Sequence, residues 1–238
     1  MELIIQNAHI GYPNTPLVKE INLKMTKGEV VLLMGNNGMG KTTFIKSILN
    51  QIPLLSGDIL INHQSIKNIA PQEIAKKIAV VFSTKNKPYH YTTRDLIALG
   101  RWTHYPFYFD LNAKDKTLID KVIEDLGLKK YENTRLENLS DGNLQKAFIA
   151  RALVQESPMI ILDEPTAHLD ESNKIMLYQL LRSLAKENNK MILFSSHDWR
   201  LAKEFSDKIA YIKNQKMQFG QVESIMNNNN ELCQPIQF

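Results

Sequence analysis

Short apolar runs recur along the chain and indicate buried β-strands. They occupy residues 30–34, 57–61, 78–82, 159–162 and 191–194. The stretches after residue 41 and over residues 171–188 instead space their apolar side chains three or four positions apart, as amphipathic helices do. Since strands alternate with helices, the pattern predicts an α/β fold with a mainly parallel sheet. Ligands of such sheets bind at the carboxyl ends of the strands.

The N-terminal region follows a different, alternating pattern. Apolar residues stand at every second position at Leu3 and Ile5 and again within residues 17–25, and the sequence Gly-Tyr-Pro-Asn at 11–14 separates the two runs. Alternation is typical of strands with one buried face, and glycine, proline and asparagine favour turns. We therefore expect an N-terminal antiparallel β subdomain that begins with a hairpin.

The segment from about residue 88 to 157 lacks strand-like runs. Within it, Asn112 and Asp115 have the spacing of a helix capping box, and an apolar helical face follows from Leu118 to Leu126 before Gly127. This pattern predicts a helical insert in the sheet domain. Residues 1–222 are then one domain, and the asparagine-rich segment 223–238 is predicted to be a loose tail.

An aromatic cluster lies inside the predicted insert. Its members are Trp102, Tyr105, Phe107, Tyr108 and Phe109. Exposed apolar side chains of this kind can form a docking surface for a partner protein. Packing of the insert's own small core explains the same residues equally well, so both interpretations stay open.

A glycine-rich motif directly follows the apolar run at 30–34. It reads Gly35-Asn36-Asn37-Gly38-Met39-Gly40-Lys41-Thr42, followed by Thr43. This fits the phosphate-binding loop G-x-x-x-x-G-K-[ST], in which backbone N–H groups at a helix N-terminus surround a polyphosphate. Lys41 would contact the β- and γ-phosphates, and the Thr42 hydroxyl would ligate Mg²⁺. The motif predicts a P-loop NTPase that binds ATP or GTP.

Composition narrows the class of protein further. The chain has 238 residues, 43% of them hydrophobic, which is enough for a substantial core. Its net charge is +4, but the lysines are scattered in pairs such as Lys76-Lys77, so we interpret them as solvated faces and expect no nucleic-acid partner. The single cysteine, Cys233, cannot form an internal disulfide, in agreement with a reducing compartment.

The N-terminus lacks the features of a signal peptide. The longest apolar runs have about five residues, whereas a membrane-spanning helix needs about twenty. A membrane role would therefore require a partner.

Three polar residues follow predicted strands and complete a candidate hydrolytic site. Asp163 and Glu164 come directly after the run at 159–162, and His197 follows the run at 191–194. Asp163 would hold Mg²⁺ through its water shell, Glu164 would act as the general base on water, and His197 would position the γ-phosphate. An Asp-Glu pair is also common as plain surface charge, and a lone histidine is more often structural.

The order of these motifs resembles the nucleotide-binding subunit of an ATP-binding cassette (ABC) transporter. Residues 139–143, Leu-Ser-Asp-Gly-Asn, resemble the family's signature, residues 164–170 the Walker B extension and D-loop, and residues 196–198 the switch-histidine loop. The resemblance spans residues 12–220 and implies that ATP is the nucleotide, that Glu164 and His197 are catalytic, and that Tyr12 stacks on adenine. By itself, an isolated aromatic such as Tyr12 is more often a turn or core residue.

The resemblance also implies a homodimer in the ATP-bound state. The signature residues of one copy would face the γ-phosphate bound by the other. These residues are Ser140, Asp141, Gly142, Asn143 and the D-loop residue Asp170. Ser140 would cap the signature helix, so that its first amide groups face the phosphate.

Three positions depart from the family pattern. Ser83 stands where a glutamine usually contacts Mg²⁺ and senses the transporter, so any metal contact there would pass through water. Asp141 replaces a usual glycine, and its carboxylate suits a helix N-terminus but must turn away from ATP. Asn143 replaces a usual glutamine. None of these changes removes a backbone donor, so we expect an active ATPase.

Within the family, residues 96–101 and the short chain resemble the ATPases of importers for iron chelates, haem and cobalamin. Two copies would then dock beneath two integral-membrane permease subunits on the cytoplasmic face of the membrane, and an extracytoplasmic binding protein would deliver the substrate. An ABC exporter remains the closest alternative. A DNA-directed cassette ATPase would carry long coiled coils, and no sustained heptads occur here. A small-molecule kinase leaves residues 139–143 unexplained.

Overall fold

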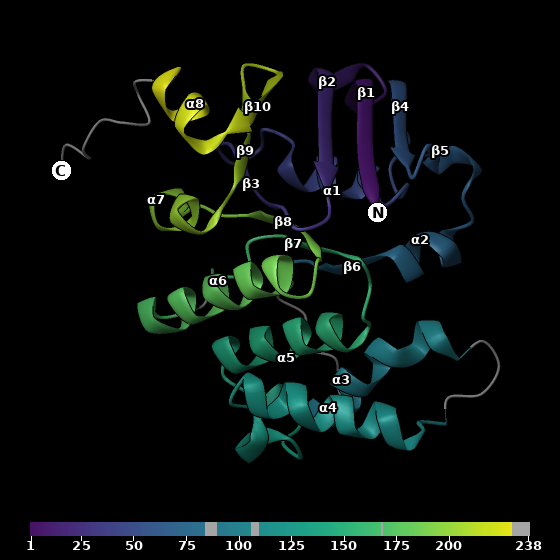
Figure 1. Ribbon diagram of the computed structural model, residues 1–238, viewed down its shortest axis with the longest axis vertical. Coiled ribbons are helices and arrows are strands. Elements are labelled where there is room, and N and C mark those ends of the chain that lie inside the picture. Colours follow the sequence, from purple (N-terminus) through teal and green to yellow (C-terminus); the bar gives the residue numbers. More distant parts are fainter. Residues whose placement is uncertain (84–89, 106–109, 168, 230–238) are drawn as a thin grey trace.

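The computed structural model describes residues 1–83, 90–105, 110–167 and 169–229. Within these ranges, one curled sheet has the strand order β5-β4-β1-β2-β10-β9-β3-β8-β7-β6. The strands are β1 (Glu2–Tyr12), β2 (Thr15–Thr26), β3 (Val30–Met34), β4 (Ser56–Ile61), β5 (Gln64–Ser65), β6 (Ile78–Val81), β7 (Met159–Leu162), β8 (Met191–Ser195), β9 (Lys208–Lys213) and β10 (Lys216–Gln221). Figure 1 shows β1, β2 and β4 upright at the top of the molecule.

Helices cover the sheet and form the lower part of the molecule in Figure 1. They are α1 (Lys41–Ile48), α2 (Pro71–Lys77), α3 (Thr93–Ala98), α4 (Ala113–Asp125), α5 (Asp141–Val154), α6 (Glu171–Lys186), α7 (Trp199–Ala202) and α8 (Val222–Asn227). Short 3₁₀ helices cover Ile66–Asn68, Leu99–His104, Lys129–Tyr131, Leu136–Asn138 and Lys203–Phe205.

The predicted mainly parallel sheet is confirmed. Strand β3 pairs in parallel with β8 and β9, and β7 pairs in parallel with β6 and β8. The N-terminal hairpin is also confirmed, because β1 and β2 are antiparallel and turn at residues 13–14. The structure therefore matches the expected α/β architecture with an antiparallel N-terminal layer.

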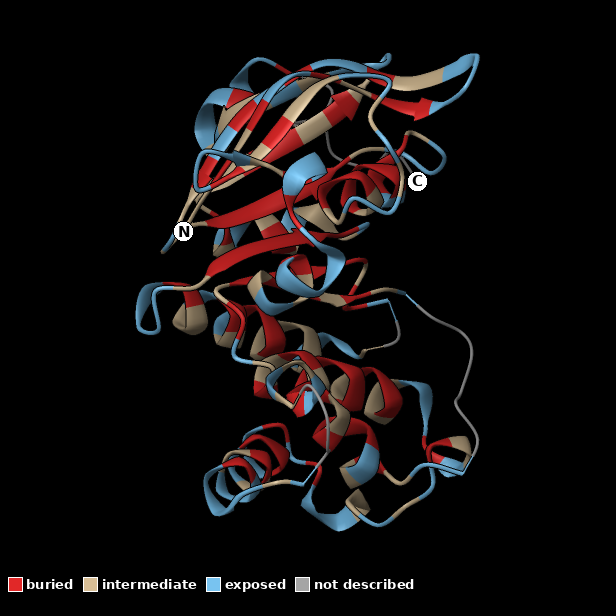
Figure 2. Cartoon of the chain, turned by 90° about the vertical axis from the view of Figure 1, so that its right-hand side faces the viewer, coloured by how far each residue is buried: buried red, intermediate tan, exposed pale blue. Residues whose placement is uncertain are grey.

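Alternate residues of β3 divide the core into two parts. Val31 and Leu33 pack with Phe44 of α1 and with the apolar faces of β1 and β2. Val30 and Leu32 point to the other side, into the cluster formed by α3 to α6. Figure 2 shows the resulting buried band through the centre of the molecule. Helix α1 is thus held between the two β layers, which fixes the loop that precedes it.

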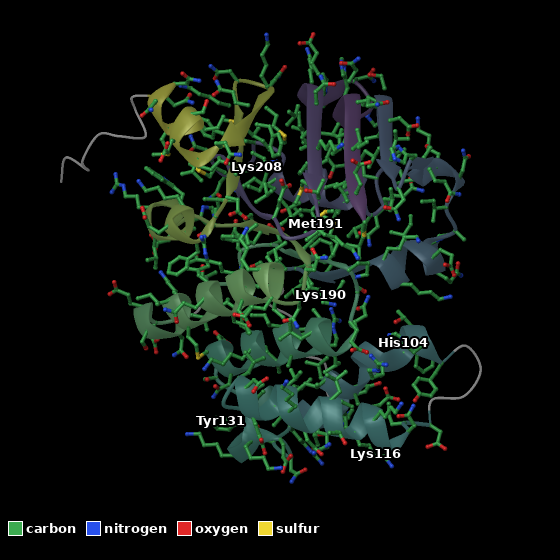
Figure 3. All side chains as sticks on the ribbon, in the orientation of Figure 1. His104, Lys116, Tyr131, Lys190, Met191 and Lys208 are labelled. Carbon is green, nitrogen blue, oxygen red and sulfur yellow. The ribbon has the colours of Figure 1, made fainter. Side chains whose placement is uncertain are left out.

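The helical insert is confirmed within the part of residues 88–157 that the structure describes. That part contains α3, α4 and α5 and an isolated bridge between Thr92 and Arg135, but no strand. Figure 3 labels His104, Lys116 and Tyr131, which all lie in this lower part.

The capping prediction at Asn112 holds for one of its two contacts. Asn112 accepts a hydrogen bond from the backbone of Asp115 at 3.0 Å and caps α4. The Asp115 carboxylate instead contacts Tyr105 and lies 2.8 Å from Nε of Arg101. Burial alone would raise the pKa of Asp115, but the hydrogen bond from Tyr105 and the charge of Arg101 lower it below its usual range. A buried ion pair therefore joins the start of α4 to the 3₁₀ helix after α3.

Different members of the aromatic cluster agree with different interpretations, the docking surface or the core of the insert. Trp102 is 58% exposed, whereas Tyr105 donates to the buried Asp115 and so packs within the insert. Phe107, Tyr108 and Phe109 lie outside the described residues.

Gly100 lets the insert pack closely, and we expect its replacement by alanine to be destabilising. An added Cβ would lie 2.1 Å from the carbonyl oxygen of Arg151 in α5 and 2.5 Å from Cγ2 of Val154. Separating these backbones should cost about 1–3 kcal/mol of unfolding free energy, measured by urea denaturation. Gly220→Ala is the control, because its nearest neighbour would be 3.6 Å away. Equal stability of the two variants would contradict the close packing.

The C-terminal region differs in part from the predicted loose tail. Helix α8 covers Val222–Asn227, and its Ile225 and Met226 are buried. These apolar side chains join the cluster on the helix-covered face of the sheet, which explains why the chain stays ordered there. Residues 230–238 lie outside the described residues. In the described ranges, no helix has the length and apolar character needed to cross a bilayer.

Candidate active site

The glycine-rich motif forms a loop between β3 and α1. Gly38 and Gly40 have φ angles of 77° and 101°, a region that glycine enters without strain. Lys41 folds back over the loop and donates to the carbonyl oxygen of Gly35 at 2.8 Å. The loop therefore encloses the lysine at the N-terminus of α1, as expected for a phosphate-binding loop.

The electrostatics of Lys41 suit an anionic ligand. The residue is 6% exposed, and burial lowers the pKa of its ammonium group, while Glu164 and Asp163 partly oppose this shift. An anion close to Lys41 would favour the charged form and recover the lost solvation.

Thr42 and Asp163 meet at the base of this loop. Thr42 Oγ1 donates to Asp163 Oδ2 at 2.7 Å, although the two residues are 121 positions apart in the sequence. Ser195, at the end of β8, donates to the other carboxylate oxygen of Asp163, also at 2.7 Å. The parallel order β3-β8-β7 brings these strand ends together, as the sequence predicts.

Glu164 and His197 form the second contact of the site. His197 Nε2 lies 2.7 Å from Glu164 Oε1, and the two side chains are 48% and 24% exposed. Glu164 has a φ of 53°, unusual for a residue with a side chain, and its backbone N–H donates to Ser195 Oγ at 2.8 Å. The predicted partners are thus brought together at the solvent-accessible mouth of the site.

Sequence reasoning missed Ser195. Its hydroxyl contacts both Asp163 and the backbone of Glu164, yet in the sequence the residue only follows the apolar run at 191–194. The available signal was the pair Ser195-Ser196 between an apolar run and His197. Only the structure shows that Ser195 has no exposed surface.

A cavity of about 180 Å³ lies over the loop. Its lining comprises Leu17, Asn37, Gly38, Gly40, Lys41, Thr42, Thr43 and Glu164. A second cavity of about 330 Å³ adjoins it, lined by Met34, Gly35, Asn36, Asn37, Ser196, His197, Trp199 and Tyr211. Trp199 and Tyr211 were not among the predicted site residues. Glu164 lines the first cavity and His197 lines the second.

The predicted signature residues form a separate group. Ser140 caps α5 by accepting from the backbone of Asn143 at 3.4 Å, and Asp170 caps α6 by accepting from the backbone of Asn173 at 2.8 Å. The hydrogen bond from the Asn173 backbone lowers the pKa of Asp170. A cavity of about 390 Å³ joins both caps, and its lining also contains Asp141, Gly142 and Asn143.

This signature cavity shares no lining residue with the two cavities around the phosphate loop. One chain therefore does not bring its own signature to its own loop. Side-chain hydrogen bonds with Lys130 and with Asn143 lower the pKa of Tyr131.

Tyr12 and Ser83 lie outside the lining of all three cavities. Tyr12 ends β1 with 51% of its surface exposed, so its ring is open to stacking. Ser83 is exposed two residues beyond the end of β6, and Val81 of that strand accepts from the backbone of Asp163 at 2.8 Å. Ser83 is therefore near the strand ends of the site.

The oxygen atoms at the base of the loop fit Mg²⁺. Thr42 Oγ1 and Asp163 Oδ2 are hard oxygen ligands and lie 2.7 Å apart. The described residues contain no cluster of three or more metal-binding side chains. This donor set matches a magnesium ion that takes its other ligands from phosphate and water.

Fold and site together define a P-loop nucleotide-binding ATPase. The family model described as ABC transporter matches residues 18–167, well over half of the chain. The chain belongs to this family and is one of its ATP-binding subunits, which are ATPases.

Two relatives and a solved structure agree with this assignment. An uncharacterized ABC transporter ATP-binding protein of Methanocaldococcus jannaschii is 37% identical over 222 residues, 93% of this chain and 77% of that protein. The iron(3+)-hydroxamate import ATP-binding protein FhuC of Bacillus subtilis is 33% identical over 204 residues, 86% of this chain and 76% of that protein. A structure described as an inward-facing metal-chelate type ABC transporter has a TM-score of 0.83 at 25% identity, covering 97% of this chain and 87% of that one.

Proposed function

We propose that Glu164 and His197 form the hydrolytic pair of this ATPase. The observation that carries the proposal is their 2.7 Å contact beside the cavity that Lys41 and Thr42 line. The Glu164 carboxylate accepts the proton of the attacking water, and His197 holds the carboxylate and the γ-phosphate in position. Lys41 contributes positive charge where negative charge builds up on the phosphate oxygens.

Thr42 and Asp163 hold Mg²⁺ in this proposal. When bound, the ion neutralises charge on the β- and γ-phosphates. Ser83 contributes at most a contact through water, because its side chain is short. Backbone N–H groups of residues 36–43 bind the phosphates, and the exposed ring of Tyr12 stacks on adenine.

The complete site in this proposal needs two copies of the chain. The signature cavity with Ser140 and Asp170 lies apart from the phosphate loop of the same chain, so it is available to a nucleotide held by a second copy. A head-to-tail homodimer would bury two ATP molecules between such surfaces. The start of α5 then directs its free amide groups and its dipole at the γ-phosphate.

We infer that the ATPase energises an importer for iron complexes, such as a ferric siderophore or haem, or for cobalamin. Support comes from relatives named for iron(3+)-hydroxamate import and petrobactin import, which are 33% and 29% identical to this chain. Two chains would dock on the cytoplasmic face of the membrane beneath two integral-membrane permease subunits. The helical insert would contribute to this contact, and an extracytoplasmic binding protein would deliver the substrate.

Copurification tests the importer proposal. The tagged chain is isolated from solubilised membranes, and integral membrane proteins and small molecules that accompany it are identified by mass spectrometry. We expect a multi-span permease together with an iron chelate, haem or cobalamin. Recovery of an export channel would reject import but not transport, and recovery of DNA or only soluble partners would reject the transporter role.

Ser83→Gln should change coupling more than basal ATP hydrolysis. The amide side chain of glutamine is longer than that of serine, so in this proposal it would contact both the metal and the permease from its position after β6. The measured quantity is the ratio of substrate transported to ATP hydrolysed in the assembled transporter. Ser224→Gln, at an exposed position of α8, is the control. A ratio that matches the parental one would argue against a coupling role for this position.

A further inference from the structure

Backbone pairing ends before the two residues whose side chains meet. The last aligned pair of the β7–β8 ladder is Leu162 with Phe194. Glu164 and His197 both lie beyond it, and Glu164 has a φ of 53°, outside the strand region. Strand pairing alone therefore does not fix the 2.7 Å distance between Glu164 and His197, and side-chain contacts must supply the remaining constraint.

Ser195 supplies one such constraint. Its hydroxyl donates to Asp163 Oδ1 at 2.7 Å and accepts from the backbone N–H of Glu164 at 2.8 Å. The residue stands two positions before His197, so a single fully buried side chain connects the histidine segment to both carboxylate residues.

Tyr178 of α6 supplies a second constraint on the far side of the pair. Its hydroxyl lies 3.1 Å from Thr166 Oγ1 and 3.0 Å from Ser196 Oγ. Thr166 is two residues after Glu164, and Ser196 directly precedes His197. Ser196 also accepts from the backbone N–H of Asp198 at 3.1 Å. The Tyr178 hydroxyl therefore bridges the segments that carry the two hydrolytic side chains.

Packing alone does not account for the hydroxyl of Tyr178. The ring is fully buried, and its centroid lies 5.3 Å from that of Phe194 and 5.5 Å from that of Phe205. Phenylalanine would make the same ring contacts without placing a polar atom in the core. The hydroxyl instead has two partners, one on each segment, as a bridge requires.

We propose that Ser195 and Tyr178 are positioning residues for ATP hydrolysis, because their hydroxyl groups hold Glu164 and His197 at contact distance. The inference rests on the proposed function of Glu164 and His197. It adds two residues that do not line any of the three cavities and act only through the segments they join.

The test measures kcat, KM for ATP, ATP affinity and the unfolding midpoint of the purified chain with ATP and Mg²⁺. Tyr178→Phe keeps the ring and removes only the bridging atom, so kcat should fall roughly three- to tenfold, as expected for one lost hydrogen bond. Ser195→Ala removes two contacts and should lower kcat further. KM and ATP affinity should stay within about twofold for Tyr178→Phe, since Tyr178 lines none of the three cavities and does not contact Asp163.

Tyr91→Phe is the matched control, because it removes the same atom from a ring that is 42% exposed. Parental kcat in Tyr178→Phe would overturn the inference. The inference would also be overturned if ATP affinity and the unfolding midpoint fell in parallel with kcat, because that result indicates a general structural role. Glu164→Gln is assayed alongside: its hydrolysis at the parental rate would reject the hydrolytic pair itself, whereas an inactive Glu164→Gln with a fully active Tyr178→Phe would reject only the positioning role.

Discussion

Lys41→Ala is expected to abolish ATP binding. The ammonium group is held over the phosphate loop by the carbonyl oxygen of Gly35, in the cavity that receives the phosphates in our account. Two charge-assisted hydrogen bonds to phosphate contribute about 1.5 kcal/mol each at least, so affinity should fall by about 100-fold or more. Titration calorimetry with ATP and Mg²⁺ measures this loss directly.

Lys46→Ala is the control for this variant. Lys46 carries the same charge on the last turn of the same helix α1 but does not line the cavity. Its replacement should leave ATP affinity unchanged. Normal affinity in Lys41→Ala would contradict the assignment of the loop, and an equal loss in both variants would indicate a general effect of charge.

Glu164→Gln is expected to block hydrolysis while ATP still binds. Glutamine has the shape of glutamate and can still contact His197, but it cannot take a proton from water. General-base catalysis contributes about 10²–10⁴-fold to rate, so kcat should fall by at least about 100-fold. ATP then persists in the site, and the chain should accumulate as an ATP-bound dimer, visible by size-exclusion chromatography with light scattering.

Glu187→Gln makes the same chemical change at an exposed position after the end of α6. It should hydrolyse ATP at the parental rate and form no persistent dimer. Parental hydrolysis in Glu164→Gln would remove this residue as the base. A Glu164→Gln chain that is inactive yet monomeric with ATP would support the base and contradict the two-copy site.

The sequence predicts most of the sheet because its strands are unusually clear. The run at β3 is buried at every position, and the same holds for β7 and β8. The phosphate loop could be predicted equally well from the sequence, because local backbone geometry determines where its glycines and its lysine must stand. Lys41, Asp163 and His197 were expected at one edge because they follow parallel strands. The contacts of Thr42 with Asp163 and of Glu164 with His197 agree with this.

Strands β9 and β10 were not predicted. In β9 the apolar run at 209–212 has only four residues and is bounded by lysines, so it is less conspicuous than the five-residue run of β3. The turn that follows uses Asn214 and Gln215 with φ angles of 48° and 60°. Asparagine-glycine is the usual sequence signal for such a turn. Here Gln215 stands in place of the glycine, so the signal is absent.

The polar contacts around the site also could not be predicted from the sequence. Ser195 and Tyr178 are 17 positions apart and on different elements, and only the folded chain shows that both contact the segments of Glu164 and His197. The pairing of Asp115 with Arg101 has the same origin, because the spacing of Asp115 favoured a cap contact and tertiary packing supplied a buried cation instead.

Uptake by cells tests the central claim most directly. Cells that lack the chain are supplied with the parental chain or with Glu164→Gln, and uptake of a radioactive ferric siderophore, haem or cobalamin is measured. Our account predicts that uptake of one of these compounds requires the chain and returns with the parental form but not with Glu164→Gln. Two results would contradict an ATPase that energises import of these compounds. One is uptake of all three compounds at the normal rate in cells without the chain, and the other is full recovery of uptake in cells supplied with Glu164→Gln.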